Sequence, residues 1–239
     1  MPAPLYPVNL GVAGRRCLVV GGGRVAARKI AGLLACGANV TVVAPDIADE
    51  IANLGGPTTA AGSVEIARRR YTPGEAAHYR LVIAATGDRP VDRAVAADAE
   101  AAGVWVNVAD DPSACTFTLP AIHRDGAVTV AVATSGTSPA TAAWLRDRLA
   151  VAAGPGIGDL ANLLAGARDR LQRHGIATEA MSWGRLLDTI AGMVASGDVE
   201  QARRLVAAWE ADQVRGAAGS PPGMHGGGAS SGADTRGSP

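Results

Sequence analysis

Aromatic residues are scarce in this chain, and neither sign of charge is in excess. Only 3% of the 239 residues are aromatic, while small aliphatic residues and glycine dominate, a composition typical of an α/β core built from small side chains. The 22 basic and 22 acidic residues cancel, so no overall positive field favours nucleic acid or an anionic membrane surface. Any anionic ligand must therefore meet local cations.

Cysteines are few, and long apolar runs are absent. The three cysteines, Cys17, Cys36 and Cys115, lack the spacing of a redox or metal motif, and their odd number favours a reducing compartment. No His, Cys or carboxylate group has the spacing of a preformed metal site, so no metal ligands are predicted. Without a signal-peptide pattern or an apolar run of about 18 residues, we expect a cytoplasmic protein with no membrane segment.

A strand, a glycine cluster and a helix follow one another between Arg15 and Lys29. The apolar run at 17–20 is typical of a strand, and the helical pattern at 25–35 leads to a second strand pattern at 40–43. Two parallel strands joined by a crossover helix form a βαβ unit of about this length. The sequence therefore predicts an α/β arrangement.

The glycines of this unit follow a G-x-G-x-x-A order at Gly21, Gly23 and Ala26. In a dinucleotide-binding turn, the first glycine allows the tight turn and the second lets the backbone approach a pyrophosphate. The unpaired N–H groups at the start of the helix then face the anion. Taken alone, the motif also fits an α/β turn that binds no nucleotide.

Further strand patterns lie at 64–67, 81–85 and 104–108, with a helical pattern at 91–102. Because strands alternate with helices, we expect an α/β fold with a Rossmann-like, doubly wound parallel sheet of about five strands over 1–113. The carboxyl ends of the strands would then share the edge at which such folds bind ligands.

The pattern changes after Pro112. Strand patterns at 116–119 and 128–133 follow one another with a turn at 124–126 and no helix between them. We expect 114–153 to form a small α+β segment, which by structural analogy is a dimerisation element.

Helical patterns dominate the remainder. They cover residues 139–149, 158–173, 178–195 and 198–213. We expect a helical domain over 154–214, followed by a disordered tail over 215–239 that is rich in Gly, Ser and Pro. His225 in this tail is expected to be exposed and without function.

Three separated segments resemble one family. GGGRVAARK beginning at Gly21, NVADDPSACTFTLPA at 107–121 and VAVATSGTSPATAAWLR at 130–146 are similar to the precorrin-2 dehydrogenase family, the dehydrogenase and chelatase module of siroheme synthases. The resemblance covers about residues 1–210 and implies NAD-dependent oxidation of precorrin-2 to sirohydrochlorin. In some members ferrous iron insertion follows, which gives siroheme. It also implies a homodimer, here as a module without the methyltransferase.

The resemblance places the family's catalytic aspartate at Asp110, directly after the fifth strand pattern. Removal of a hydride from a reduced tetrapyrrole also requires loss of a proton, and a carboxylate can accept it. The same carboxylate could take pyrrole protons during metal insertion. Alternatively, Asp110 and Asp111 form only a turn before Pro112, and of the two Asp111 fits the turn better.

Cofactor and substrate contacts are predicted at several other positions. The pyrophosphate is expected near Gly21, Gly22, Gly23, Arg24 and Val25, the adenosine ribose near Pro45 and Asp46, and the nicotinamide near Thr86. Substrate carboxylates are expected at Arg124, Ser138 and Arg146, although a surface arginine or a plain helix N-cap also fits these residues.

Two points stay open at this level. The absence of an arginine at the end of the second strand favours NAD, although Pro45 displaces Asp46 from the usual place of the ribose-binding acid, and Arg24 leaves NADP open. His123, at a turn, is a weak candidate metal ligand. The alternatives to a dehydrogenase are a nucleotide-sensing or tetrapyrrole-binding protein without catalysis, and a chelatase that inserts ferrous iron or cobalt without oxidation.

Overall fold

The computed structural model describes residues 5–54, 62–179 and 181–218. The chain divides into two compact units. The first comprises Met1–Ile122 and Ala131–Arg146, and the second comprises His123–Val130 and Asp147–Pro239. The predicted segment 114–153 thus contributes to both units. Each unit is described by itself below.

The first unit is built on a five-stranded parallel sheet. Its strands are β1 (Arg16–Val20), β2 (Asn39–Val43), β3 (Ser63–Ala67), β4 (Leu81–Ala84) and β5 (Trp105–Val108). They lie in the order β3-β2-β1-β4-β5. The predicted doubly wound α/β sheet is confirmed. The strand order reverses between β1 and β4, the point at which such sheets bind ligands beyond the carboxyl ends of the strands.

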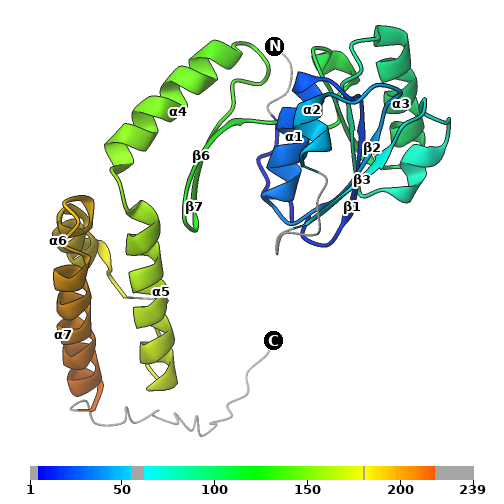
Figure 1. Cartoon of the computed structure of the whole chain (residues 1–239). Coiled ribbons are helices and arrows are strands. Elements are labelled where there is room, and N and C mark those ends of the chain that lie inside the picture. Colours follow the sequence, from blue (N-terminus) through cyan, green and yellow to red (C-terminus); the bar gives the residue numbers. More distant parts are fainter. Residues whose placement is uncertain (1–4, 55–61, 180, 219–239) are drawn as a thin grey trace, which may run out of the picture. The chain divides into compact units, whose positions relative to one another are not determined.

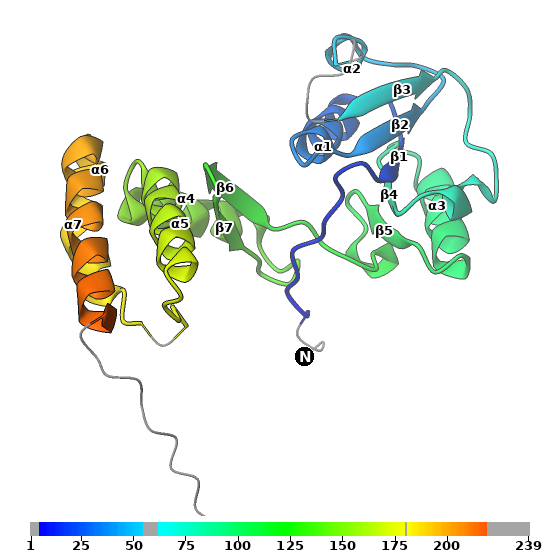
Figure 2. The same ribbon diagram turned by 90° about the horizontal axis from the view of Figure 1, so that it is seen from below.

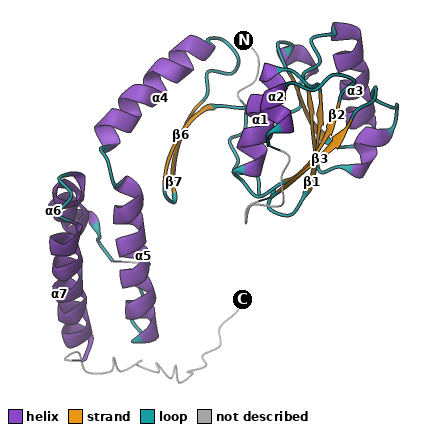
Figure 3. Ribbon diagram, viewed as in Figure 1, coloured by secondary structure: helices purple, strands orange, loops and turns teal. Residues whose placement is uncertain are grey.

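Helices cover both faces of this sheet (Figures 1 and 3). Cys17 and Val19 of β1 pack with α1 (Arg24–Leu34) and α2 (Asp49–Ala52). Leu18 and Val20 pack on the opposite face with α3 (Arg89–Ala101). Since alternate residues of one strand face two apolar layers, β1 has to be apolar throughout, as its sequence is.

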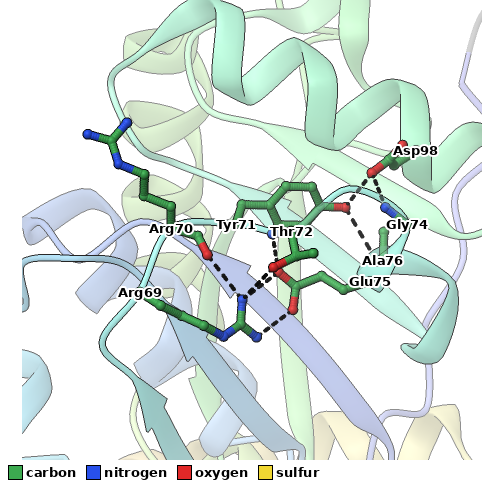
Figure 4. A network of polar contacts seen from close by, with 8 residues as sticks. All are labelled: Arg69, Arg70, Tyr71, Thr72, Gly74, Glu75, Ala76 and Asp98. Atoms are coloured by element: carbon green, nitrogen blue, oxygen red, sulfur yellow. Dashed lines mark hydrogen bonds and ion pairs between the residues drawn. The ribbon is translucent and has the colours of Figure 1, made fainter.

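The connection from β3 to β4 is fixed by a polar network (Figure 4). Arg69 donates to both carboxylate oxygens of Glu75, at 2.9 and 2.7 Å, and Glu75 starts the short helix η1 (Glu75–His78). Tyr71 donates to Asp98 of α3 at 2.9 Å, and the same carboxylate oxygen accepts from the backbone N–H of Gly74 at 2.6 Å. The network ties this loop to α3.

The prediction of a strand at 116–119 is wrong. This segment turns back along β5, where the Thr116 hydroxyl accepts from the Val106 N–H at 2.7 Å and the Asn107 side chain donates to the Phe117 carbonyl at 3.1 Å. The Thr116 N–H also donates to the Val106 carbonyl at 2.9 Å, so one short backbone contact and two side chains hold the segment in place of a strand ladder. The short helix η2 (Pro112–Ala114) precedes this segment.

A hairpin and a long helix follow. The strands β6 (Ala121–Asp125) and β7 (Val128–Val132) form a separate two-stranded sheet. Of the predicted turn at 124–126, only Gly126, whose φ is 53°, lies in the turn, because β6 runs through Asp125. The helix α4 (Pro139–Ala153) extends past the predicted end at 149.

The second unit contains three packed helices, α5 (Ile157–Arg173), α6 (Gly184–Ala195) and α7 (Val199–Ala218), which lie side by side in Figures 1 and 2. Leu163, Ile190 and Val206 are buried between them. The helix predicted from 178 begins only at Gly184, and α7 extends into the tail predicted from 215. The rest of that tail, including His225, lies outside the described residues.

No single helix among the described residues is long and apolar enough to cross a membrane. The consecutive helices α4 and α5 pass such a test only as a pair joined across the break between them, by length and composition.

Candidate functional site at the carboxyl edge of the sheet

The glycine loop after β1 is held tightly against two neighbouring loops. Gly21 has a φ of 128°, and a Cβ at this position would collide with the carbonyl oxygen of Ala85, just after β4. A Cβ on Gly22 would collide with the carbonyl oxygen of Asp46, just after β2. Both glycines are therefore required by the close approach of protein backbone, a role for Gly22 that the motif alone did not suggest.

Gly23 is different, because it faces open space. It is the N-cap of α1, no side chain caps the helix, and its first turn contains no acidic residue. Nothing lies within 4 Å of a Cβ built on Gly23. The N–H groups of the first turn are thus left without a side-chain acceptor beside an open approach, which fits the pyrophosphate of a dinucleotide. The side chains of Arg24 and Val25 are exposed next to this approach.

Pro45 and Asp46 are exposed after β2, and the Asp46 backbone packs against Gly22. Thr86, after β4, is more constrained. Its hydroxyl donates to the buried Asp92 at 2.8 Å and accepts from the Asp88 N–H at 3.0 Å. The Thr86 hydroxyl is therefore already committed to the turn that starts α3.

Asp110 lies in the loop after β5, with its side chain exposed and a φ of 60°. This left-handed conformation is uncommon for residues other than glycine, although Asp and Asn adopt it more readily than most. The next residue, Asp111, is buried. One of two adjacent carboxylates thus faces outward while the other anchors the loop.

The Asp111 carboxylate has three partners. It accepts from Ser113 Oγ at 2.6 Å and from Arg93 Nε at 3.0 Å, and Arg89 Nε lies 3.5 Å away. The hydrogen bond from Ser113, followed by that from Arg93, lowers the pKa of Asp111 to about 2. Sequence reasoning gave Asp111 a turn-forming role and missed both arginines. Their i, i+4 spacing at the start of a helix was the available signal.

The helix of the glycine loop approaches the Asp110 loop. Burial and the neighbouring Arg28 lower the pKa of Lys29, while Cys115 and Asp110 raise it. The packing shows the same approach, because Ala109, the residue before Asp110, packs against the core cluster that contains Ala26 and Ile30 of α1. The Cys115 thiol in turn accepts from the Val108 N–H at 3.2 Å, which fixes the same loop.

The loop at 134–138 also lies beside this turn. A Cβ on Gly136 would be 3.9 Å from Cβ of Pro112. Ser138 Oγ accepts from the Thr141 N–H at 3.2 Å, which confirms its predicted N-cap geometry at α4. The Thr134 hydroxyl donates to the Ser138 carbonyl at 3.0 Å and closes the loop.

The structure therefore gathers most predicted residues at one edge of the first unit. The glycine loop, Asp46, Thr86 and Asp110 follow β1, β2, β4 and β5 respectively, and the loop before Ser138 approaches the last of these turns at Gly136. Arg146 is half-buried on α4 in the same unit.

Arg124 belongs to the second unit. With His123 and Asp125 it lines a cavity of about 470 Å³ that Ala150 and Pro155 also border. Within 5–54, 62–179 and 181–218, no group of three or more His, Cys, Asp or Glu residues is arranged to hold a metal ion.

Comparisons with known proteins agree with this geometry. Residues 8–121 match the family model NAD_binding_7, described as "Putative NAD(P)-binding", so this part of the chain is similar to nicotinamide dinucleotide-binding domains. The match includes the glycine loop and the turn that carries Asp110.

The curated relatives are siroheme synthases. That of Chromobacterium violaceum is 40% identical over 216 residues, which cover 87% of this chain and 45% of the relative. That of Nitrosomonas europaea is 40% identical over 194 residues, which cover 80% of this chain and 40% of the relative. The chain thus spans less than half the length of these relatives.

Among solved structures, "SirC, precorrin-2 dehydrogenase" matches 89% of this chain and its own entire length, with a TM-score of 0.60 and 24% sequence identity. At 24% identity this match supports a shared fold and nothing further. Together with the siroheme synthases, it confirms the resemblance identified from the three sequence segments.

Proposed function

We propose that this chain catalyses the NAD-dependent oxidation of precorrin-2 to sirohydrochlorin. The observation that carries the proposal is the meeting of two loops at the carboxyl edge of the sheet, in a chain 40% identical to siroheme synthases over most of its length. One is the glycine loop with its open helix terminus. The other holds an outward-facing carboxylate, Asp110, next to Ala109, which packs against the core cluster that contains Ala26 and Ile30 of the glycine-loop helix.

The residues divide the chemistry between them. Bound NAD supplies the hydride acceptor. The backbone of Gly21, Gly22 and Gly23 and the first turn of α1 hold the pyrophosphate, and Asp110 accepts the proton that the tetrapyrrole loses with the hydride. Because the Thr86 hydroxyl is committed to Asp92, we assign Thr86 a contact with the nicotinamide through its methyl group or backbone.

We propose NAD rather than NADP as the cofactor. The exposed Asp46 follows β2, where a carboxylate can accept hydrogen bonds from the ribose hydroxyls and repel a ribose phosphate. The exposed Arg24 is the group that would favour NADP. Comparing kcat/KM for the two cofactors in the wild type, Asp46→Asn and Arg24→Gln tests this choice.

Arg124, Arg146 and Ser138 are proposed to meet substrate carboxylates, since arginine binds carboxylates through two parallel hydrogen bonds. The Ser138 side chain already caps α4, so its contribution would come through this helix terminus. The three free thiols of the described structure support a cytoplasmic location.

A homodimer is also proposed. Among the residues of α4, Trp144 is 59% exposed and Val151 is 82% exposed, and Leu145 and Leu149 are exposed as well. Exposed apolar side chains in this number on one helix fit an interface with a second copy of the chain. Sedimentation velocity tests this, and a Leu149→Asp variant that sediments as the wild type does would argue against α4 as the interface.

The direct test mixes the purified protein with enzymatically prepared precorrin-2 and NAD and follows the visible spectrum. We expect conversion to sirohydrochlorin. If no conversion occurs with NAD or NADP, the proposal is wrong, and binding of the tetrapyrrole without turnover would favour a carrier or sensor. Incubating sirohydrochlorin with ferrous iron or cobalt in the absence of NAD separately tests the proposed second activity, metal insertion.

A further inference from the structure

Two arginines on α3 share one buried carboxylate. Arg89 and Arg93 are four residues apart on the helix, and each approaches Asp111 Oδ2 through its Nε atom, at 3.5 and 3.0 Å. The other oxygen of Asp111 is occupied by Ser113. Because a cation in the first turn of a helix is unfavourable for the helix dipole, helix stability does not explain Arg89 there.

The outer edges of both guanidinium groups remain available. The side chains of Arg89 and Arg93 are 69% and 56% exposed. Within the parts of the chain that the structure describes, no protein atom accepts a hydrogen bond from an Nη atom of either arginine. Asp111 therefore contacts both guanidinium groups at Nε, and their Nη atoms remain available to solvent or a ligand.

The other carboxylates at this end of α3 are engaged elsewhere. Asp92 is buried and accepts from the backbone and the hydroxyl of Thr86. Asp88 caps the helix by accepting from the Val91 N–H at 3.4 Å. Neither makes an ion pair with Arg89 or Arg93, so Asp111 is their protein partner in the described structure.

We propose that Arg89 and Arg93 form a binding site for a carboxylate of the tetrapyrrole substrate, with Asp111 as the residue that positions them. The inference rests on the proposed function, since the substrate it invokes carries many carboxylates. Paired Nη groups match a carboxylate in geometry and charge. Asp111 directly follows Asp110, so a peripheral carboxylate held here places the ring beside the residue that accepts the proton.

The test is a titration of the full chain with sirohydrochlorin, the proposed product, followed by absorbance in the absence of cofactor. Arg89→Gln and Arg93→Gln are each expected to raise Kd by about tenfold, the typical effect of losing one charge-assisted hydrogen bond. The double variant should raise Kd further and flatten its dependence on salt. In turnover, KM for precorrin-2 should rise more than kcat falls.

Arg80→Gln provides the matched control. Arg80 is exposed immediately before β4, at the opposite edge of the sheet, and removing it changes the net charge by the same amount. We expect the Kd of Arg80→Gln for sirohydrochlorin to stay within about twofold of the wild-type value, since surface charges at this distance are largely screened. All variants should bind NAD as the wild type does.

Three results separate the possible failures. If the double variant binds sirohydrochlorin as tightly as the wild type, the carboxylate site is wrong. If affinity for NAD falls in parallel with affinity for sirohydrochlorin, the arginines act by shaping the loop, which also overturns the proposal. If the wild type neither binds nor produces sirohydrochlorin, the proposed function itself fails. Arg89→Lys keeps the charge without the fork, and an intermediate Kd would support bidentate binding.

Discussion

The turns after β3 and β5 both pair arginine with a carboxylate, but they use the arginine differently. After β3, Nη1 and Nη2 of Arg69 donate to the two carboxylate oxygens of Glu75 (Figure 4). This pair of Nη atoms, the guanidinium fork, is therefore closed, because a protein group occupies it. After β5, Asp111 receives the Nε atoms of two arginines, so both forks stay open. The first arrangement can only hold a loop, whereas the second can also receive a ligand.

The backbone shows the same difference. The turn after β3 is tied to α3 through Tyr71 and Asp98, and its residue with a positive φ is a glycine, Gly74, which adopts this conformation without strain. The turn after β5 keeps Asp110 at a φ of 60°, and the contacts of Asp111 and Cys115 hold it there. A less favourable conformation that is fixed by its surroundings is typical of a functional position.

The largest expected effect is on kcat, and only substitutions in the turn after β5 should produce it. We expect Asp110→Asn to lower kcat by about 10²- to 10⁴-fold, because proton transfer by a positioned base contributes that much. Asn suits the left-handed backbone, so the fold should persist. Single-turnover absorbance measurements with precorrin-2 and NAD provide the rate.

The matched control for that experiment is Glu75→Gln in the turn after β3. Its kcat should stay within about twofold of the wild-type value, since its carboxylate contacts only its own loop. Equal losses of rate in the two variants would remove the distinction between the turns, and a wild-type rate in Asp110→Asn would remove Asp110 from the mechanism.

The second effect is on stability, and it compares one hydroxyl from each turn. Thr116→Val removes the acceptor of the Val106 N–H at the edge of the sheet, and should cost about 1–3 kcal/mol because that donor loses its partner. Tyr71→Phe removes two hydrogen bonds, the one to Asp98, which keeps the Gly74 N–H, and a long one of 3.3 Å that the hydroxyl accepts from the Ala76 N–H. Because the second bond is close to the length limit and Asp98 keeps a donor, we expect a smaller cost of about 0.5–1.5 kcal/mol. Urea unfolding at neutral pH measures both. The reverse order would show that the turn after β3 is the stronger anchor.

Much of this difference could not be predicted from sequence. The glycine order and the apolar strands predicted the sheet correctly, because buried parallel strands have to be apolar and a crossover needs a helix between them. The segment 116–119 was mistaken for a strand because Thr116 and Phe117 favour strands. In the structure this segment contacts β5 through the Thr116 hydroxyl, the Asn107 amide and one short backbone bond to Val106, and no local sequence pattern predicts these contacts.

The sequence led to the Asp110 and Ser138 proposals but missed the network that surrounds them. Asp111 and Arg93 are 18 residues apart, and their pairing depends on β5 and the start of α3 lying at the same edge of the sheet. Conversely, Thr86 was predicted as a cofactor ligand, yet its hydroxyl is committed to Asp92. Tertiary packing determines which side chains of two different elements meet, and the spacing of residues in the sequence does not predict these pairs.

The third effect is a dependence of stability on pH, which should come from Asp111. Its pKa in the folded chain is about 2, below the ordinary 3.8. A carboxyl group with a lowered folded pKa stabilises the fold above its unfolded pKa, and this contribution disappears as pH falls through the folded value. Asp111→Asn should therefore be less stable than the wild type at pH 6, with the difference shrinking between about pH 4 and pH 2.

Thermal unfolding across this pH range measures the difference, with Asp188→Asn as the control. Asp188 is exposed on α6 and makes no hydrogen bond or ion pair in the described structure. We expect the stability difference between Asp188→Asn and the wild type to be constant over the same range. If the stability difference between Asp111→Asn and the wild type is also constant over this pH range, the pKa of Asp111 is not lowered by folding and the prediction is wrong.

The smallest effect is expected from the closed fork after β3. Arg69 is 45% exposed and Glu75 is 13% exposed, and such partly exposed pairs contribute about 0–1 kcal/mol. The hydrogen bond from Arg69 lowers the pKa of Glu75, so Glu75→Gln should lose its small stability difference from the wild type at acid pH, and also in about 1 M salt. Since the fork offers no open edge, the same variant should bind sirohydrochlorin with wild-type affinity. A raised Kd in Glu75→Gln would show that sirohydrochlorin binding does not require arginines whose Nη atoms lack a protein partner. The position of Asp110 would then be the remaining functional difference between the two turns.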